Sequence, residues 1–377
     1  MVWDIAAVVA LVLSATALWL TLSTLREFGN RDPLALSPLV RRVLMIREIP
    51  LDTVAAFAEA RPDHDRIAFI VNPTKAGVAQ LREAAYRACS LRYLPEPIWL
   101  HTSQDDSGVQ AARDAAEAGA DLLVAVGGDG TVRATAKAAL EHGLPMGLIP
   151  MGTGNLLARN INVPVGDPSD ALRNVLDGTE RKIDVGWLEL YGEEGEPRRE
   201  LFLVVAGVGI DADIFANVDD SLKRNLGWLA YYLSAVKFFG AKRMRASVAL
   251  DGGEPKIDRM RSVLMANCGK LPAGITLVAD AKLDDGELDF LTVDSRGGLG
   301  WASLFGDFVA QGAGIPSNRL VKSWRISSID HVRGTTADVH TELPQRVQAD
   351  GDDIGRAVRV VSSVDKRALR VRTRGSR

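Results

Sequence analysis

The 377-residue chain has little cysteine, little net charge and no internal repeat. Its two cysteines, Cys89 and Cys268, cannot build a disulfide framework and lack metal-ligand spacing, which fits a reducing compartment. A formal net charge of −3 gives no global attraction to nucleic acid, so we expect no nucleic-acid partner. Because 47% of the residues are hydrophobic and 25% are charged, the composition is that of a folded protein, and the length indicates two domains.

One long uncharged run is present near the N-terminus. Residues 5–25, IAAVVALVLSATALWLTLSTL, would form a helix about 31 Å long, which matches one hydrocarbon core. Behind it, the positive-inside rule is met by Arg26, Arg31, Arg41, Arg42 and Arg47. We therefore expect a single-pass anchor in the cell membrane with the catalytic part in the cytoplasm. A cleaved signal peptide or a buried helix is the alternative, although a signal peptide normally opens with Lys or Arg and only Asp4 precedes this run.

The rest of the chain divides into two regions that differ in their pattern of strand-like and helix-like segments. After a proline-broken linker at 26–63, strand-like and helix-like segments alternate from 64 to 180, which predicts a parallel sheet covered on both faces. Short strands separated by turns dominate 181–377 and predict a mostly antiparallel β-sandwich, whose last strand could return to the first domain. The expected fold class is therefore an α/β N-terminal domain, a β-sandwich second domain and an N-terminal transmembrane helix at 1–25.

Three polar, glycine-bearing loops follow strands of the predicted parallel sheet. They are NPTKAG (72–77), GGDGT (127–131) and GTGN (152–155). The carboxyl ends of parallel strands share one edge, and glycine loops that open helices present backbone N–H groups to phosphates. Asp129 would repel a bare phosphate, so it fits only if a divalent cation bridges it or if it orients a water or hydroxyl. Each loop alone could be an ordinary capped turn, but the three together favour a nucleotide cleft.

At this point a family resemblance is evident. The segments VNPTKAG, VGGDGTVRATA and LIPMGTGNLLAR resemble the diacylglycerol kinase catalytic domain, and AGVGIDA, KLDDGELDF and VQADGDDIG match its bacterial lipid kinase branch. The same superfamily holds sphingosine and ceramide kinases and, more distantly, NAD kinases. Over about residues 66–372 the resemblance implies an NAD kinase/diacylglycerol kinase-like fold, ATP and Mg²⁺ as cofactors, and a membrane lipid as acceptor. Diacylglycerol is the typical acceptor, giving phosphatidic acid. The sequence leaves open whether the protein forms a homodimer.

The resemblance also implies site residues. The residues expected to hold ATP lie in the three loops and at the end of the second strand: Asn72, Pro73, Thr74, Lys75, Ala76, Thr102, Gly127, Gly128, Asp129, Gly130, Thr131, Gly152, Thr153, Gly154 and Asn155. A structural magnesium is implied at Lys282, Asp285 and Glu287, with the first and last acting through backbone carbonyls. From the residues alone, Asp284-Asp285-Gly286 is equally a hairpin turn, and its spacing does not require a metal.

The family's general base is the acid that ends an Asp-Gly-Glu motif. Here the matching segment is Asp350-Gly351-Asp352, in which aspartate replaces glutamate and is shorter by one methylene. Because a general base must reach the hydroxyl proton, either Asp352 serves with backbone compensation, or Asp350 or Asp353 serves, or activity is low. A polar hairpin turn without catalytic role is the alternative. The resemblance makes Asp129 the third catalytic candidate, acting through Mg²⁺.

The sequence departs from the family pattern at three further places. Arg133 and Ala134 stand where many members have Asn-Glu, Leu156 stands where many have Asp, and Gly77 stands where a lysine is frequent. The loss of an acid at Leu156 leaves Asp129 as the main magnesium candidate. This loss and the aspartate at position 352 leave a membrane-tethered nucleotide- or lipid-binding protein without turnover as one alternative. The shared glycine loop leaves an NAD kinase-like enzyme as another. The apolar stretch 227–239 could line an acyl groove or simply belong to the core.

Overall fold

The computed structural model describes residues 65–103, 107–209, 243–270, 277–278, 280–295 and 327–374, and the account below concerns these residues. The expected membrane anchor, the linker and the apolar stretch 227–239 lie outside them. Within the described part of the chain, no helix has the length and apolar character needed to span a membrane.

The first part of the described chain alternates strands and helices. Its elements are β1 (Ile67–Val71), α4 (Val78–Leu91), β2 (Ile98–His101), α5 (Val109–Glu117), β3 (Leu122–Gly127), α6 (Asp129–His142), β4 (Met146–Pro150), α7 (Leu156–Asn160) and α8 (Pro168–Asp177). The strands pair in parallel in the order β2-β1-β3-β4. The parallel sheet expected from the alternation is confirmed.

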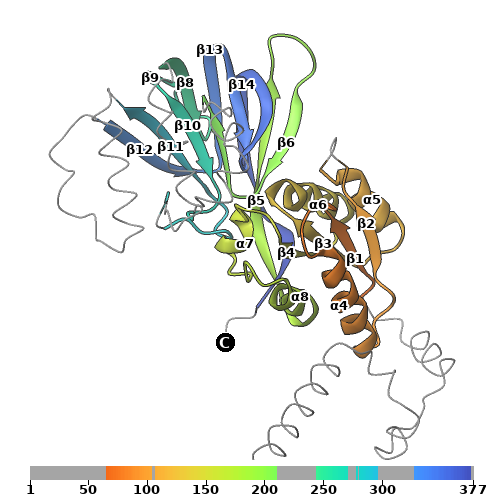
Figure 1. Cartoon of the computed structure of the whole chain (residues 1–377). Coiled ribbons are helices and arrows are strands. Elements are labelled where there is room, and N and C mark those ends of the chain that lie inside the picture. The colour runs from red at the N-terminus through yellow and green to blue at the C-terminus, as the bar shows by residue number, and fades with distance from the viewer. Residues whose placement is uncertain are drawn as a thin grey trace, which may run out of the picture. The chain divides into compact units, whose positions relative to one another are not determined.

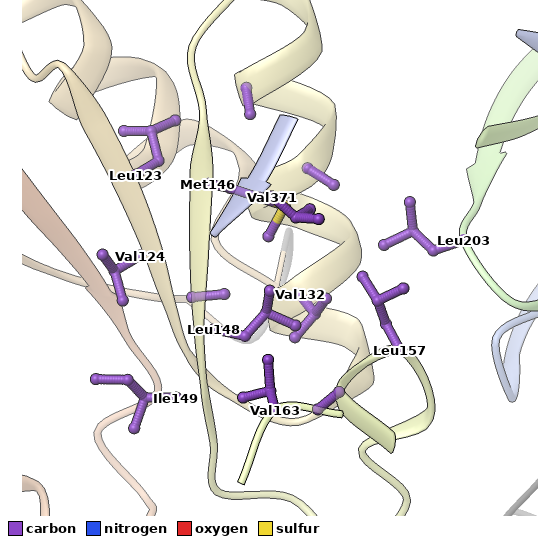
Figure 2. Packing of buried hydrophobic residues seen from close by; sticks show 14 of the residues in the cluster. Leu123, Val124, Val132, Met146, Leu148, Ile149, Leu157, Val163, Leu203 and Val371 are labelled. Atoms are coloured by element: carbon purple, nitrogen blue, oxygen red, sulfur yellow. The ribbon is translucent and has the colours of Figure 1, made fainter. Parts of the chain in front are cut away.

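The parallel strands form because their residues can be buried on both faces. Every residue of β1, β3 and β4 is buried, as parallel sheets covered by helices require. Small residues let α6 pack closely on this sheet, since Ala136, Ala138 and Ala139 are at most 1% exposed. Figure 2 shows the resulting core, in which Leu148 of β4 and Val132 of α6 lie near Leu157 of α7. The loops after β3 and β4 therefore stand on a rigid base.

The second part of the described chain is built from strands. They are β5 (Thr179–Tyr191), β6 (Arg198–Phe202), β7 (Val205–Val208), β8 (Met244–Leu250), β9 (Lys256–Met260), β10 (Ser262–Ala266), β11 (Leu288–Ser295), β12 (Ser327–Gly334), β13 (Thr336–Ala349) and β14 (Asp352–Thr373). The pairings among these strands are antiparallel. A separate hydrophobic cluster that includes Phe202, Met265 and Phe290 fills this part. The mostly antiparallel β-sandwich is thus confirmed.

The last strand, β14, joins the two parts (Figure 1). It pairs antiparallel with β13 and β5, and Val371 near its end pairs in parallel with Met146 of β4. Val371 also belongs to the first hydrophobic cluster, together with Leu148 (Figure 2). The turn that starts β14 has positive φ at Asp350 (51°) and Gly351 (94°), which is typical of the tight hairpin turns that Asp-Gly forms.

Candidate active site

The polar loops after β1, β3 and β4 lie at one edge of the parallel sheet. The strand order β2-β1-β3-β4 reverses between β1 and β3, and ligands of open α/β sheets bind at such a switch point. The loops after β3 and β4 touch, because a Cβ built on Gly152 would lie 2.6 Å from the Gly128 Cα. Met151 N donates to Gly127 O at 2.8 Å. Asn72 N donates to Val126 O at 3.0 Å, and a Cβ built on Gly77 would lie 3.9 Å from Met151 Cε, so the NPTKAG loop lies beside the other two.

The NPTKAG loop is shaped by Asn72. Its Oδ1 accepts hydrogen bonds from Thr74 N at 3.1 Å and from Thr74 Oγ1 at 2.7 Å, and its carbonyl accepts one from Lys75 N at 3.3 Å. Pro73, Thr74 and Ala76 are exposed, while Lys75 is half-buried. The Asn72 side chain thus holds the turn, and Lys75 brings a positive charge to the loop.

Asp129 ties the loops after β3 and β4 together. Its Oδ2 accepts a hydrogen bond from Asn155 N at 2.9 Å and its Oδ1 accepts one from Leu156 N at 2.6 Å. A side chain at position 154 is excluded, since a Cβ built on Gly154 would lie 2.6 Å from Asp129 Oδ2. Burial raises the pKa of Asp129 to about 6, the two backbone N–H groups oppose the shift, and the negative charges of Asp350 and Asp352 add to it.

The GTGN loop closes on itself through Asn155. This residue has φ of 49° and is 4% exposed; its Oδ1 accepts from Gly152 N at 3.0 Å and its Nδ2 donates to Gly152 O at 2.7 Å. Thr153 is exposed at the tip of the loop. Leu156 is 7% exposed and its side chain belongs to the core. The Asn155 side chain therefore gives the loop its shape rather than reaching toward a ligand.

Helix α6 begins at the glycine loop without a side-chain cap. Its N-cap residue is Gly128, so the N–H groups of the first turn, from Asp129 onward, have no side-chain cap. Thr131 is 4% exposed and packs under the loop, because a Cβ on Gly127 would lie 2.6 Å from Thr131 Oγ1. A helix N-terminus of this kind attracts anions, and phosphates in particular.

Asp352 lies over the first turn of α6. Its Oδ2 would lie 3.2 Å from a Cβ built on Gly130. Arg133, also on α6, donates from Nη2 to Asp352 Oδ2 at 2.8 Å and from Nη1 to Ala349 O at 3.1 Å. Their side chains are 17% (Arg133) and 46% (Asp352) exposed. Two departures from the family pattern, Arg133 and Asp352, are thus in direct contact.

Asp350 has a different environment from Asp352. It is 5% exposed, and its carboxylate accepts hydrogen bonds from Leu203 N at 2.8 Å, Val204 N at 2.8 Å and Val205 N at 3.0 Å. Burial raises its pKa, while the charge of Arg133 and the three N–H groups oppose the shift. Because its oxygens are engaged in this backbone nest, Asp350 anchors the turn and leaves Asp352 as the acid that faces the glycine loop.

Removal of the Asp350 carboxylate should therefore destabilise the fold. Asp350→Ala leaves three buried backbone N–H groups without an acceptor, and we expect the free energy of unfolding to fall by about 3 kcal/mol or more. Chemical denaturation followed by circular dichroism measures this loss. Asp353→Ala is the matched control, since Asp353 is exposed and its carboxylate accepts a single backbone hydrogen bond, from Gly355 N at 2.8 Å, and pairs with Arg346 at 3.2 Å. Equal denaturation midpoints for the two variants would contradict this role of Asp350.

Two residues of this region were not predicted as site residues. Ser107 precedes α5, and its Oγ would lie 3.6 Å from a Cβ on Gly130. Arg133 was noted only as a departure from the family pattern. The signal for Ser107 was its place in the loop after β2, at the same sheet edge as the others. Thr102, in that loop, is half-buried, donates from its N to Val71 O at 2.9 Å, and packs its methyl group against Gly108.

The turn at 282–287, where the resemblance implies a structural magnesium, has other partners. The Asp285 carboxylate accepts from Glu287 N at 3.2 Å and pairs with Arg333, which also contacts Glu287 at 2.9 Å. Lys282 is exposed. Across the residues that the structure describes, no group of three or more His, Cys, Asp or Glu side chains could hold a metal ion. The side chains of this turn, as they stand, do not fit the implied cation.

Comparison with known proteins agrees with this geometry. The model of the diacylglycerol kinase catalytic domain matches residues 66–188, and that of the YegS C-terminal NAD kinase β-sandwich-like domain matches residues 204–373. A Pseudomonas aeruginosa (strain PAO1) protein named "Probable lipid kinase YegS-like" is 31% identical over 235 residues, which cover 60% of this chain and 72% of that protein. The diacylglycerol kinase of Bacillus subtilis (strain 168) is 30% identical over 48% of this chain and 57% of its own length.

A solved structure shares the fold. The crystal structure of a diacylglycerol kinase from Bacillus anthracis str. Sterne superposes with a TM-score of 0.58 at 19% identity and covers 83% of this chain and 98% of that one. The fold is thus that of a parallel α/β domain joined to a β-sandwich. The chain belongs to the diacylglycerol kinase catalytic-domain family, in its YegS-like lipid kinase branch.

Proposed function

We propose that this protein transfers the γ-phosphoryl group of ATP to the hydroxyl of a membrane lipid. The observation that carries the proposal is the position of Asp352, whose carboxylate lies over the first turn of α6 at the glycine loop. Family membership supports a kinase-type phosphotransferase. Diacylglycerol, giving phosphatidic acid, is the acceptor that we place first, because the Bacillus subtilis relative is named a diacylglycerol kinase.

The residues of the three loops fit a nucleoside triphosphate with a divalent cation. The uncapped start of α6 and the adjoining backbone at Gly128 and Gly152 would bind the phosphates, with Lys75 at the neighbouring loop. Each Asp129 oxygen accepts one hydrogen bond and keeps one further acceptor position. A bound magnesium ion would neutralise charge on the phosphates. Asp129 would hold the ion, whose positive charge would favour the ionised form that burial disfavours and would offset the repulsion from Asp350 and Asp352.

Asp352 supplies the acid–base chemistry in this proposal. As the new bond forms between the lipid oxygen and the γ-phosphorus, the bond between that phosphorus and the bridging oxygen of ADP breaks. The hydroxyl proton passes to the Asp352 carboxylate. Arg133 holds this carboxylate against Gly130, so the shorter aspartate is drawn toward the glycine loop. The pair therefore offers a physical means of compensating for the missing methylene.

The raised pKa of Asp129 predicts a dependence of activity on pH. Below about pH 6 the carboxyl group is protonated and cannot hold a cation, so kcat/KM for ATP should fall about tenfold per pH unit there. Because the folded-state pKa lies above the unfolded one, the contribution of Asp129 to the stability of the nucleotide-free protein is lost as pH rises from about 4 to 6. Initial rates at fixed magnesium between pH 5 and 8 measure the first effect.

The control for the pH dependence is a variant that cannot titrate at position 129. Denaturation midpoints of wild type and Asp129→Asn should diverge between pH 4 and 6, with wild type losing stability relative to the variant as pH rises. If the wild-type kcat/KM is flat from pH 5 to 7, Asp129 does not carry the cation as proposed.

One observation favours a second function. The Asp352 carboxylate is already paired with Arg133, and a protein that binds ATP and lipid without turnover could keep this pair permanently. ATP binding with no phosphorylated product across a broad lipid panel would support this alternative. An NAD kinase-like activity is separated from the lipid kinase by the solubility of the labelled product, because only a phospholipid enters chloroform.

We also propose that residues 5–25 hold the protein at the membrane where its acceptor resides. The uncharged run and the arginines behind it support this placement. Membrane fractionation of the full chain tests it. Full-length protein should sediment with membranes and resist extraction by high salt, and recovery of protein that begins near residue 18 would contradict a retained anchor.

A further inference from the structure

The turn that follows Leu283 faces one guanidinium. Arg333 Nη2 contacts the carboxylates of Asp285 and Glu287, the latter at 2.9 Å, and Arg333 Nε lies 3.7 Å from Asp289 Oδ1. Arg333 stands directly opposite Asp289 in the antiparallel register of β11 and β12, where side chains of paired residues share a face. One arginine thus contacts three carboxylates. Asp285 and Glu287 belong to the turn, and Asp289 belongs to β11.

The three acids of this cluster differ in burial. The Asp289 side chain is 5% exposed and that of Asp285 is 20% exposed, whereas Glu287 is 42% and Arg333 is 41% exposed. Asp289 Oδ1 also lies 2.6 Å from His331 Nε2. Carboxylates withdrawn from water in this way require a positive partner, because burial without one carries a large desolvation cost.

The backbone of the same turn has its own protein partner in Asp184. This residue is fully buried; its N donates to Leu283 O at 2.6 Å, and its Oδ2 accepts from Gly286 N at 2.6 Å. Its Oδ1 accepts from Arg367 N at 2.6 Å, which links the turn to β14. The conformation of the turn is therefore fixed by hydrogen bonds from within the chain.

We propose that Arg333 is the resident cation of this turn and stands in place of a divalent metal ion. The Asp285 carboxylate is paired with the Arg333 guanidinium at one oxygen and accepts from Glu287 N at the other. A divalent cation at this carboxylate would meet the fixed positive charge of the guanidinium, whose planar donors match several carboxylates at once. The turn then needs no metal for its stability. This inference is independent of the phosphotransfer reaction.

The test measures thermal stability of the full chain without nucleotide, in EDTA and in millimolar MgCl₂ or CaCl₂. Wild type is expected to melt within about 1 °C in all three. Arg333→Gln leaves the three carboxylates without their cation, so its Tm should fall in EDTA and rise by at least about 3 °C with the divalent ion. Arg333→Lys keeps the charge and should stay insensitive. Arg333→Gln combined with Asp285→Asn should lose the gain.

Two results would overturn the proposal. In the first, wild-type Tm falls in EDTA and Asp285→Asn abolishes that fall, which would place a metal at Asp285. In the second, Arg333→Gln melts like wild type and ignores divalent ions, which would mean that Arg333 stabilises nothing here. If Arg333→Gln does not fold, the effect of EDTA on the Tm of wild type and of Asp285→Asn decides whether a metal binds at Asp285. Isothermal titration of MgCl₂ into these two EDTA-treated proteins measures the same binding without heating.

Discussion

Asp129→Asn is expected to lower kcat/KM for ATP in lipid phosphorylation by about 10²- to 10³-fold. The variant removes the negative charge that would hold a cation at the glycine loop, and charge stabilisation of this kind is a large part of phosphoryl transfer. It also turns an amide NH₂ toward one of the two N–H groups at Asn155 and Leu156, which destabilises the fold, but it removes a buried charge that costs stability above pH 6, so we expect the free energy of unfolding to change little at neutral pH. Labelled-ATP assays and chemical denaturation measure the two effects separately.

The control for this variant is a surface aspartate outside the site. Asp170 lies in the first turn of α8 and pairs with Arg173 on an exposed face, so Asp170→Asn should change neither rate nor stability by a measurable amount. If Asp129→Asn keeps wild-type activity while remaining folded, the proposed phosphate and cation site at the glycine loop is wrong.

Asp352→Asn is expected to lower kcat by about 10²- to 10⁴-fold while ATP binding is retained. An amide cannot accept the hydroxyl proton, but its shape and its contact with Arg133 are nearly unchanged. Rates with saturating ATP, together with nucleotide affinity measured by titration, separate the chemical step from binding. Equal loss of affinity and rate would show that Asp352 holds the site together instead of serving as base.

Arg133 should act through Asp352 as a positioning residue. Arg133→Ala frees the Asp352 carboxylate from both the guanidinium and its link to Ala349 O, so kcat should fall with little change in KM for ATP. In the Asp352→Asn background the same change should have no further effect on kcat, because there is no base left to position. An equal loss in both backgrounds would mean that Arg133 acts on the phosphates itself.

The sequence allows the loops and their sheet to be predicted because these depend on local pattern. Buried runs such as LLVAV, followed by glycine, specify a strand that ends at a helix, and the carboxyl ends of parallel strands must meet. The closeness of the loops at Gly128 and Gly152 therefore follows from chain pattern alone. The same reasoning predicts both the parallel sheet and the antiparallel second part.

The side-chain partners were not accessible, because they join segments far apart in the chain. Arg133 and Asp352 are 219 residues apart, and Asp350 accepts N–H groups about 145 residues upstream. Only the tertiary fold decides that Asp129 accepts from Asn155 N or that Arg333 meets Asp285. Composition and spacing identify which residues can carry chemistry. Packing decides which of these side chains instead form hydrogen bonds within the protein.

The most direct test of the lipid kinase proposal is phosphorylation of a total membrane lipid extract with labelled ATP, followed by mass spectrometry of the chloroform-soluble product. The wild-type chain should yield a labelled phospholipid, phosphatidic acid if diacylglycerol is the acceptor, and Asp352→Asn should reduce it by at least about 10²-fold. Label that stays in the aqueous phase with both proteins, or equal product from both, would contradict a lipid kinase that uses Asp352 as its base.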